Sequence, residues 1–264
     1  MNNVVFNNNI KALIIGVSKF QDKFIADVPN IKQNVKQLKQ VLSNNENKVV
    51  VSLNEKKNRI LRKLYGLYLD ADKDDTVFIY YSGHGLINPD DNQVYLTATD
   101  TTVEFMEHDG ISVQAIYQLF VKIKAKRKVL VIDACNSGKI MDYASDNDFL
   151  KSQNVYIITS ASKNSPAYYP VDNPDVPTYF TGAFVDILTN GLSGYRKYIK
   201  PDEIYGELYK YSLSKRLPRP KLFAHGSFRF VENNKAKFNS AVGSSYLNKI
   251  NFYLLNSVLR LSAK

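Results

Sequence analysis

The amino-acid sequence predicts an α/β domain with a mainly parallel sheet and helices on both of its faces. Short runs of apolar residues alternate along the chain with longer segments whose apolar residues recur at helical spacing. The strand-like runs are apolar at nearly every position, which is typical of parallel strands because both of their faces are buried. These observations predict a three-layer sandwich with a six-stranded sheet in the middle.

In the first half, strands and helices follow each other in turn. The first predicted helix places Ile31, Val35 and Leu38 on one side, and the last opens with Ser112 as its N-cap. In order, the predicted elements are a strand over 11–17, a helix over 30–42, a strand over 48–53, a helix over 56–69, a strand over 75–82, a hairpin arm over 93–102 and a helix over 112–123.

The second half completes one domain over residues 1–232. Its predicted elements are strands over 128–135 and 154–162, helices over 181–191 and 201–216, and a last strand over 226–232. A length of 264 residues suits a single α/β domain with an appendage. Residues 233–264 carry one apolar helical stripe, so we expect a C-terminal helical extension that packs on the domain or binds a partner.

Composition indicates a cytoplasmic protein. Cys135 is the only cysteine, which fits a reducing compartment, and the start of the chain lacks the pattern of a secretion signal. No stretch is long and apolar enough to span a membrane. The net charge is +10, but the lysines are scattered, so we favour a solvated surface over a nucleic-acid partner.

Two strand ends carry reactive side chains. The strand over 75–82 runs into "SGHG" with His84, and the strand over 128–135 ends in "DACNSG" with Cys135. In open parallel sheets, ligands bind beyond the carboxyl ends of the strands. If these two strands are neighbours, a thiol nucleophile and an imidazole acid–base face one cleft, which is sufficient for covalent acyl transfer.

The glycines beside His84 extend this hypothesis. Gly83 and Gly85 allow the backbone to turn sharply and to approach a substrate closely. The N–H groups of Gly85 and Cys135 then form an oxyanion hole. Taken alone, Cys135 reads as a small buried apolar residue, and His84 reads as a turn residue; their joint placement favours a catalytic dyad.

Other reactive groups have weaker contexts. We expect His108 to be a solvated loop residue and His225 to be structural, and Ser137 lacks a nucleophile-elbow motif. The cysteine and histidines have no metal-ligand spacing, so no metal and no cofactor are expected.

These motifs resemble those of caspase-like cysteine peptidases, the group of caspases, metacaspases, paracaspases and bacterial relatives, and the chain is identified as a bacterial-type member. The resemblance covers roughly residues 11–232 and rests on "SGHG" and "DACNSG" in this order. It implies a cysteine endopeptidase in which Cys135 is the nucleophile, His84 the acid–base, and the Gly85 and Cys135 amides the oxyanion donors. Asn136 departs from the residues common after the family's cysteine, which should affect the cleft more than the chemistry.

The resemblance also suggests a preference for cleavage after Arg or Lys. Asp133 stands where metacaspase-like members place a pocket carboxylate, Ser82 would lie nearby, and Asn34 occupies the position of a second pocket acid. A buried carboxylate would pair with a basic side chain. The other reading of Asp133 is a structural carboxylate, and the loss of a charge at Asn34 weakens the basic pocket.

Regulation and function have further alternatives. Lys139 and Lys151 are candidate self-cleavage sites, and Asp142, Asp146 and Asp148 are a weak candidate for calcium activation, since a calcium-loop pattern is absent. The expected partners are a protein or peptide substrate and a regulatory protein. The alternative function is a non-catalytic caspase-like interaction module.

Overall fold

The computed structural model describes residues 4–43, 47–144, 154–162, 168–194 and 196–236. Its main sheet has six strands in the order β10-β8-β7-β3-β1-β2, all parallel to their neighbours except the edge strand β10. The strands are β1 (Ile10–Gly16), β2 (Lys48–Leu53), β3 (Thr76–Ser82), β7 (Arg127–Asp133), β8 (Asn154–Thr159) and β10 (Lys221–His225). The predicted fold class is therefore confirmed.

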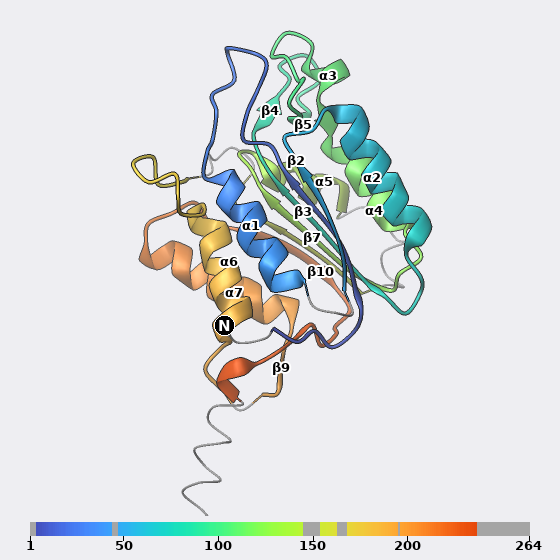
Figure 1. The fold of residues 1–264 in the computed structure, drawn as a ribbon, viewed down its shortest axis with the longest axis vertical. Helices are drawn as coiled ribbons and strands as arrows, with labels where there is room; N and C mark the ends of the chain where they lie inside the picture. The colour runs from blue at the N-terminus through green and yellow to red at the C-terminus, as the bar shows by residue number, and fades with distance from the viewer. Residues whose placement is uncertain (1–3, 44–46, 145–153, 163–167, 195, 237–264) are drawn as a thin grey trace, which may run out of the picture.

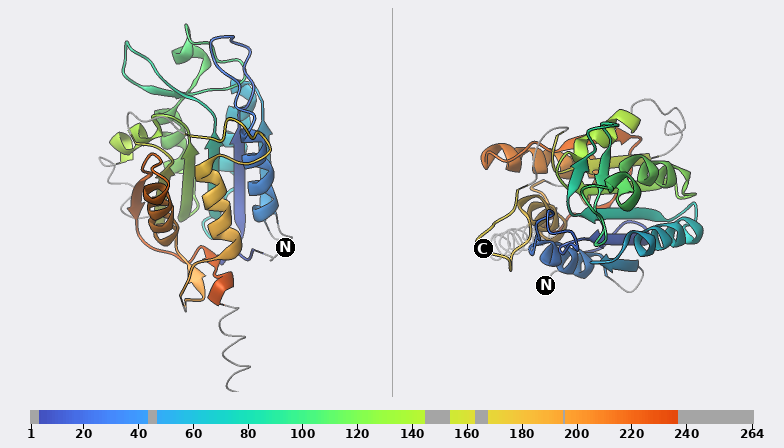
Figure 2. Two further views of the ribbon diagram at one scale, coloured as in Figure 1. Left: turned by 90° about the vertical axis from the view of Figure 1, so that its left-hand side faces the viewer. Right: turned by 90° about the horizontal axis from the view of Figure 1, so that it is seen from above.

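Helices cover both faces of the sheet (Figures 1 and 2). One face packs against α1 (Ile31–Leu42), α6 (Tyr179–Asn190) and α7 (Pro201–Ser214), and the other against α2 (Lys57–Asp70) and α4 (Val113–Lys122). Alternate residues of each central strand supply the two apolar cores: Ile14 and Phe78 face α1 and α6, whereas Leu13 and Ile79 face α2 and α4. All seven residues of β3 are buried, as a strand covered on both faces requires.

A small second sheet extends from the carboxyl end of β3. It consists of β4 (Gly85–Ile87), β5 (Val94–Leu96) and β6 (Ile111–Ser112), with β5 in the middle. The short helix α3 (Met106–Asp109) lies between β5 and β6. Ser112 caps α4 as predicted, because its Oγ accepts a hydrogen bond from the N–H of Ala115.

The prediction for the last strand was wrong in position. The sixth strand of the sheet is β10, which precedes the predicted range 226–232 and ends where Gly226 adopts a φ of 75°. Within the predicted range only β11 (Val231–Glu232) is extended, and it pairs with β9 (Tyr198–Ile199) in a separate two-stranded sheet. β10 is a half-exposed edge strand preceded by Pro218 and Pro220, and both features weaken its sequence signal.

Candidate active site

The two predicted reactive residues follow neighbouring strands. β3 pairs with β7, and the last row of their register joins Ser82 to Asp133. His84 and Cys135 each come two residues after this row, at the carboxyl edge of the sheet. Paired strands lie about 5 Å apart, so the loops that carry His84 and Cys135 start side by side, as expected.

The loop between β1 and α1 holds the imidazole of His84. The Nε2 atom lies 2.7 Å from the carbonyl oxygen of Ala26, and the ring centroids of His84 and Phe20 are 5.1 Å apart. A carbonyl oxygen can only accept a hydrogen bond, so this contact requires a proton on Nε2. In the neutral ring, Nδ1 is then the atom that can accept a proton.

Space, rather than backbone torsion, explains the glycines beside His84. A Cβ atom on Gly83 would lie 2.3 Å from the Tyr81 hydroxyl, and one on Gly85 would lie 2.2 Å from the carbonyl oxygen of Cys135. Neither glycine has a positive φ. These glycines make room for the protein's own atoms, and their role in a close approach of substrate stays a prediction.

Cys135 is partly exposed and leads into the 3₁₀ helix η1 (Ser137–Ile140). Between them, Asn136 adopts the left-handed conformation with a φ of 57°, which Asn tolerates better than most residues. Its Nδ2 donates a hydrogen bond to the carbonyl oxygen of Gly85 at 3.3 Å. The residue that departs from the family pattern therefore links the Cys135 loop to the His84 loop.

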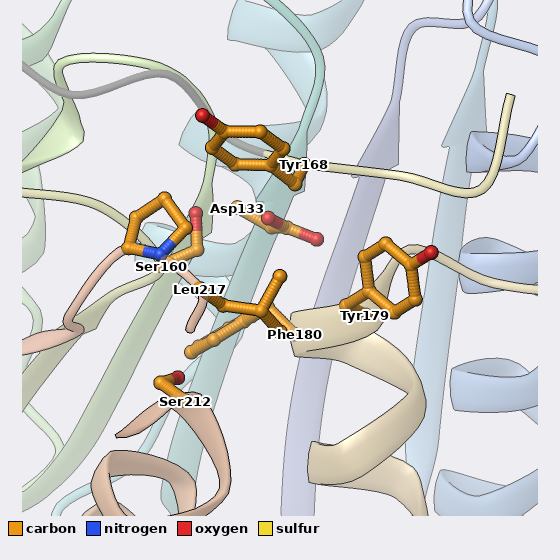
Figure 3. Close-up of a pocket in the computed structure, with 8 residues that line it drawn as sticks. Asp133, Ser160, Tyr168, Tyr179, Phe180, Ser212 and Leu217 are labelled. Atoms are coloured by element: carbon orange, nitrogen blue, oxygen red, sulfur yellow. The ribbon is translucent and has the colours of Figure 1, made fainter. Parts of the chain in front are cut away.

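A pocket opens near these loops between the carboxyl edge of the sheet and helices α6 and α7 (Figure 3). Its walls are Asp133, Ser160, Tyr168, Tyr179, Phe180, Ser212, Leu217 and Pro218. Figure 3 shows the Asp133 carboxylate between the rings of Tyr168 and Tyr179. Aromatic walls around a single carboxylate suit a side chain with an apolar stem and a cationic end.

The Asp133 carboxylate is anchored through one of its oxygens. Its Oδ2 accepts hydrogen bonds from Thr178 Oγ1 at 2.5 Å and from Thr181 Oγ1 at 2.8 Å. Within the described ranges Oδ1 makes no hydrogen bond, and it is not among the fully buried polar atoms without partners. Among the described residues, the two threonines therefore bind Oδ2 and leave Oδ1 to other contacts.

The surroundings of Asp133 act on its acidity in opposite directions. Burial raises the pKa of Asp133, and the hydroxyls of Thr178, Thr181 and Ser160 lower it less strongly. The Ser160 side chain lines the same pocket, and its hydroxyl is buried beside the Asp133 carboxylate. The pocket floor thus presents the Asp133 carboxylate and the Ser160 hydroxyl.

Ser82 and Asn34 lie behind the pocket and do not line it. Asn34 is fully buried, and its Nδ2 donates hydrogen bonds to Ser82 Oγ at 3.0 Å and to Thr178 Oγ1 at 3.1 Å. The Asn34 Oδ1 accepts from the N–H of Thr178 at 2.9 Å. This placement corrects the expectation of direct substrate contact: Asn34 supports Thr178, which in turn holds Asp133.

The remaining histidines lie away from the pocket. His108 is exposed on α3, with its Nε2 3.6 Å from a carboxylate oxygen of Glu107. His225 ends β10 opposite Val155, near the amino end of β8 and thus away from the carboxyl edge. The hydroxyl of Ser137 is buried.

Lys139 is poorly placed for self-cleavage. It lies in η1, is 8% exposed, and its Nζ donates to the carbonyl oxygen and Oδ1 of Asn92 at 2.5 and 2.6 Å. A peptidase binds its substrate extended, and this segment is helical. The other candidate, Lys151, lies outside the described residues, as do Asp146 and Asp148 of the suggested calcium cluster.

Several site residues were missed by the sequence analysis. Ala26 contributes a backbone oxygen, for which no side-chain signal exists. Thr178 and Thr181 have the spacing of a helix N-cap, but the predicted helix began at Thr181, so the cap was not recognised. Ser160 follows β8 directly, without any motif that marks a pocket.

Comparisons with known proteins agree with this architecture. Residues 10–202 match the family model described as the caspase domain. Metacaspase-1 of Eremothecium gossypii is 31% identical over 168 residues, which are 56% of this chain and 37% of that protein. Metacaspase-1A of Aspergillus niger is 26% identical over 215 residues, 74% of this chain and 50% of that protein.

Solved structures show the same fold at low sequence identity. Caspase-1 from Spodoptera frugiperda has a TM-score of 0.62 and 14% identity, with 87% of this chain and 91% of that chain covered. A protein from Geobacter sulfurreducens has a TM-score of 0.59 and 16% identity, with 83% and 94% covered.

The chain spans between a third and a half of the length of the two curated relatives named here. Both are fungal, and the bacterial type stays a prediction. In the described ranges, no helix has the length and apolar character that crossing a membrane requires. The matched domain, the shared fold and the metacaspase relatives show that this chain belongs to the caspase domain family of cysteine peptidases.

Proposed function

We propose that the chain is a cysteine endopeptidase that opens peptide bonds through an acyl-enzyme, with Cys135 and His84 as its dyad. The observation that carries this proposal is the β3–β7 register, which brings both residues to the same edge two positions beyond the last pair. The family supports peptidase chemistry on protein substrates.

The first half-reaction forms the acyl-enzyme. His84 Nδ1 takes the proton of the Cys135 thiol, and Sγ attacks the carbonyl carbon of the substrate. The carbonyl oxygen becomes an oxyanion bound by the N–H groups of Gly85 and Cys135. When the C–N bond breaks, Nδ1–H protonates the leaving amine and a thioester remains.

The second half-reaction releases the acid. A water molecule gives a proton to His84 Nδ1 and attacks the thioester, and Sγ leaves and regains that proton. Throughout both steps, the hydrogen bond from Nε2 to Ala26 keeps the ring oriented. Because a carbonyl oxygen can only accept a hydrogen bond, Nε2 keeps its proton while Nδ1 gains and loses one.

The proposed substrate preference is cleavage after a basic residue. Its support is the Asp133 carboxylate, 4% exposed, with Oδ2 tied to two threonines and Oδ1 without a partner among the described residues. An Arg or Lys side chain would pair with Oδ1, and Ser160 Oγ would accept a second N–H.

A fluorogenic peptide panel tests both parts of this proposal. Peptides that differ only in Arg, Lys, Asp or Leu at the cleaved position are compared on the wild type and on Cys135→Ala, with and without calcium. We expect turnover of the Arg and Lys peptides by the wild type alone.

The panel also separates the alternatives. Equal cleavage after Leu, or a preference for Asp, would contradict the basic pocket while leaving the dyad intact. A folded wild type without turnover under any condition would instead favour the non-catalytic interaction module.

A further inference from the structure

The carbonyl end of the peptide group between His84 and Gly85 is tightly held. The His84 carbonyl oxygen accepts from the N–H of Thr97 at 3.1 Å, and it lies 3.1 Å from the Tyr81 hydroxyl and 3.3 Å from Thr97 Oγ1. The Tyr81 hydroxyl is also 2.9 Å from the Thr97 carbonyl oxygen. Residues on β3 and just after β5 thus converge on this carbonyl.

The position of this carbonyl fixes where the Gly85 N–H points. A peptide group is planar and trans, so its C=O and N–H point in opposite directions. Because the His84 carbonyl points toward Thr97, the Gly85 N–H points away from β5. The strand pairing agrees with this direction. His84 and Thr97 form a hydrogen-bonded pair, so the next pair, Gly85 and Leu96, is a non-hydrogen-bonded one. The N–H and C=O groups of Gly85 therefore both point away from β5.

On the side that faces away from β5, Gly85 is bound by Asn136 in the turn that carries Cys135. Gly85 directs its own carbonyl away from β5, where it accepts a hydrogen bond from Asn136 Nδ2. The Gly85 N–H, which faces the same side, therefore points toward the turn that carries Cys135. The Cys135 backbone is close, because a Cβ on Gly85 would overlap its carbonyl oxygen.

We propose that the Tyr81 hydroxyl and the Asn136 amide are positioning residues that hold Gly85 between them and aim its N–H at the oxyanion. This inference rests on the proposed function. An oxyanion donor is effective when its direction is set before the reaction, and the Tyr81 hydroxyl is built in firmly, since Gly83 leaves room for it and the Tyr81 ring is buried. Burial also raises the pKa of Tyr81, so the hydroxyl remains a donor at neutral pH.

Tyr81→Phe tests the positioning role with the smallest change. The matched control is Tyr156→Phe, which removes another buried hydroxyl that donates to a backbone carbonyl, that of Gly226 at 3.0 Å, near the amino end of β8. For each variant, kcat and KM, the inhibition constant of a peptide aldehyde and the rate of Cys135 alkylation by iodoacetamide are measured. The aldehyde adduct places an oxygen in the oxyanion hole, whereas alkylation needs no such donor.

We expect Tyr81→Phe to lower kcat about tenfold, less than the ~10²–10³ that loss of an oxyanion donor costs, with KM nearly unchanged. The aldehyde should bind about tenfold more weakly, the alkylation rate should stay the same, and Tyr156→Phe should change none of these. Asn136→Gly, which allows the left-handed backbone and removes the side chain with its amide, should act in the same direction.

Contrary results separate this inference from the proposed function. Unchanged kcat and aldehyde affinity in both Tyr81→Phe and Asn136→Gly, with an active wild type, would overturn the positioning role alone. Slower alkylation with unchanged aldehyde affinity would also overturn it, because the effect would then lie on the thiol. A wild type that neither cleaves peptides nor binds the aldehyde would overturn the proposed function and this inference with it.

Discussion

The two oxygens of the Asp133 carboxylate have different surroundings, and the proposed preference for a basic side chain rests on this difference. Oδ2 is committed to Thr178 and Thr181, and Oδ1 has no hydrogen bond within the described ranges. A buried charge without a full set of partners costs free energy of folding. A ligand cation would supply the missing partner, so we interpret this cost as part of the recognition of a basic side chain.

Asp133→Asn should weaken recognition and stabilise the fold at the same time. The amide oxygen still accepts from both threonines, but the charge that pairs with Arg is lost. We expect kcat/KM for an Arg peptide to fall about 10²-fold or more relative to a Leu peptide. Because burial raises the pKa of Asp133 in the folded state, the ionised form destabilises the fold at neutral pH, and the melting temperature should rise in the variant.

The sign of this stability effect follows from proton linkage. The folded state holds the Asp133 proton to a higher pH than the unfolded chain does, so stability decreases as pH rises through the folded-state pKa. The stability difference between the variant and the wild type should therefore shrink in acid. A melting temperature that falls in Asp133→Asn at neutral pH would contradict this account.

Lys128 offers a second test of a buried charge, far from the pocket. Its Nζ donates to the carbonyl oxygen of Val121 at 2.7 Å, near the end of α4, and burial lowers the pKa of Lys128 to about 8. The unfolded chain then binds more protons between about pH 8 and 10.5, so the free energy of unfolding rises with pH in this window. Lys128→Met should remove a rise of about 3 kcal/mol.

Denaturant unfolding at pH 8 and pH 10.5 measures this effect as the difference between wild type and variant. Lys124→Met, at an exposed position of the same region, is the control and should unfold as the wild type does. If Lys128→Met keeps the rise with pH, another group is responsible.

At the residue scale, the sequence predicts residues within short motifs better than the residues that contact them in the folded protein. His84 and Cys135 follow strand ends within short patterns, so their meeting could be predicted from the topology of a parallel sheet. Ala26 acts through its backbone, and Thr178 lies 45 residues from Asp133 in sequence, so contacts of this kind arise only when the chain is folded. Asn34 occupies the sequence position of a second pocket acid, but its burial behind the pocket cannot be predicted from the sequence.

At the scale of elements, the first residue of the α6 cap contributes both to the stability of the fold and to the geometry of the pocket. Thr178 is the N-cap of α6, and its Oγ1 accepts from the N–H of Thr181 while it donates to Asp133. Asn34 on α1 bonds to the same residue, so α1, α6 and β7 are joined through one hydroxyl. Loss of this hydroxyl should affect the packing of all three elements.

Thr178→Val should destabilise the protein by about 2–3 kcal/mol, because it removes a helix cap and leaves buried polar groups without a partner. Thr178→Ser keeps the hydroxyl and should cost less than about 1 kcal/mol. Urea unfolding of both variants gives the comparison. A smaller loss in Thr178→Val than in Thr178→Ser would show that the methyl group, rather than the hydroxyl, is responsible.

Long, periodic elements are the ones that the sequence predicts best. The helices α1, α2, α4 and α7 and the buried strands follow the predicted ranges closely, because apolar spacing and full burial leave clear patterns. The edge strand β10 was missed because none of its residues is fully buried and prolines precede it. The small sheet of β4, β5 and β6 has strands too short for any periodicity.

At the scale of the whole molecule, the net charge of +10 opposes the approach of a cationic substrate. Among peptides with the same Arg at the cleaved position, those with acidic neighbours should therefore be cleaved with higher kcat/KM than those with lysine neighbours. This ratio should approach one as salt rises from about 10 mM to about 500 mM, since the Debye length falls from about 30 Å to a few ångströms. A ratio that does not depend on salt would point to local contacts instead.

Because activity depends on the β3–β7 register, recovery of activity reports when this register has formed during folding. Ser82 and Asp133 are separated by 133 − 82 = 51 residues, so their pairing closes a long loop, and long-range parallel pairing is slow. A slip of two residues keeps each side chain on its face of the sheet yet displaces Cys135 relative to His84 by about 6.6 Å. Chains trapped in such a register would bury nearly the same apolar surface and still be inactive, so recovery of turnover would trail recovery of secondary structure.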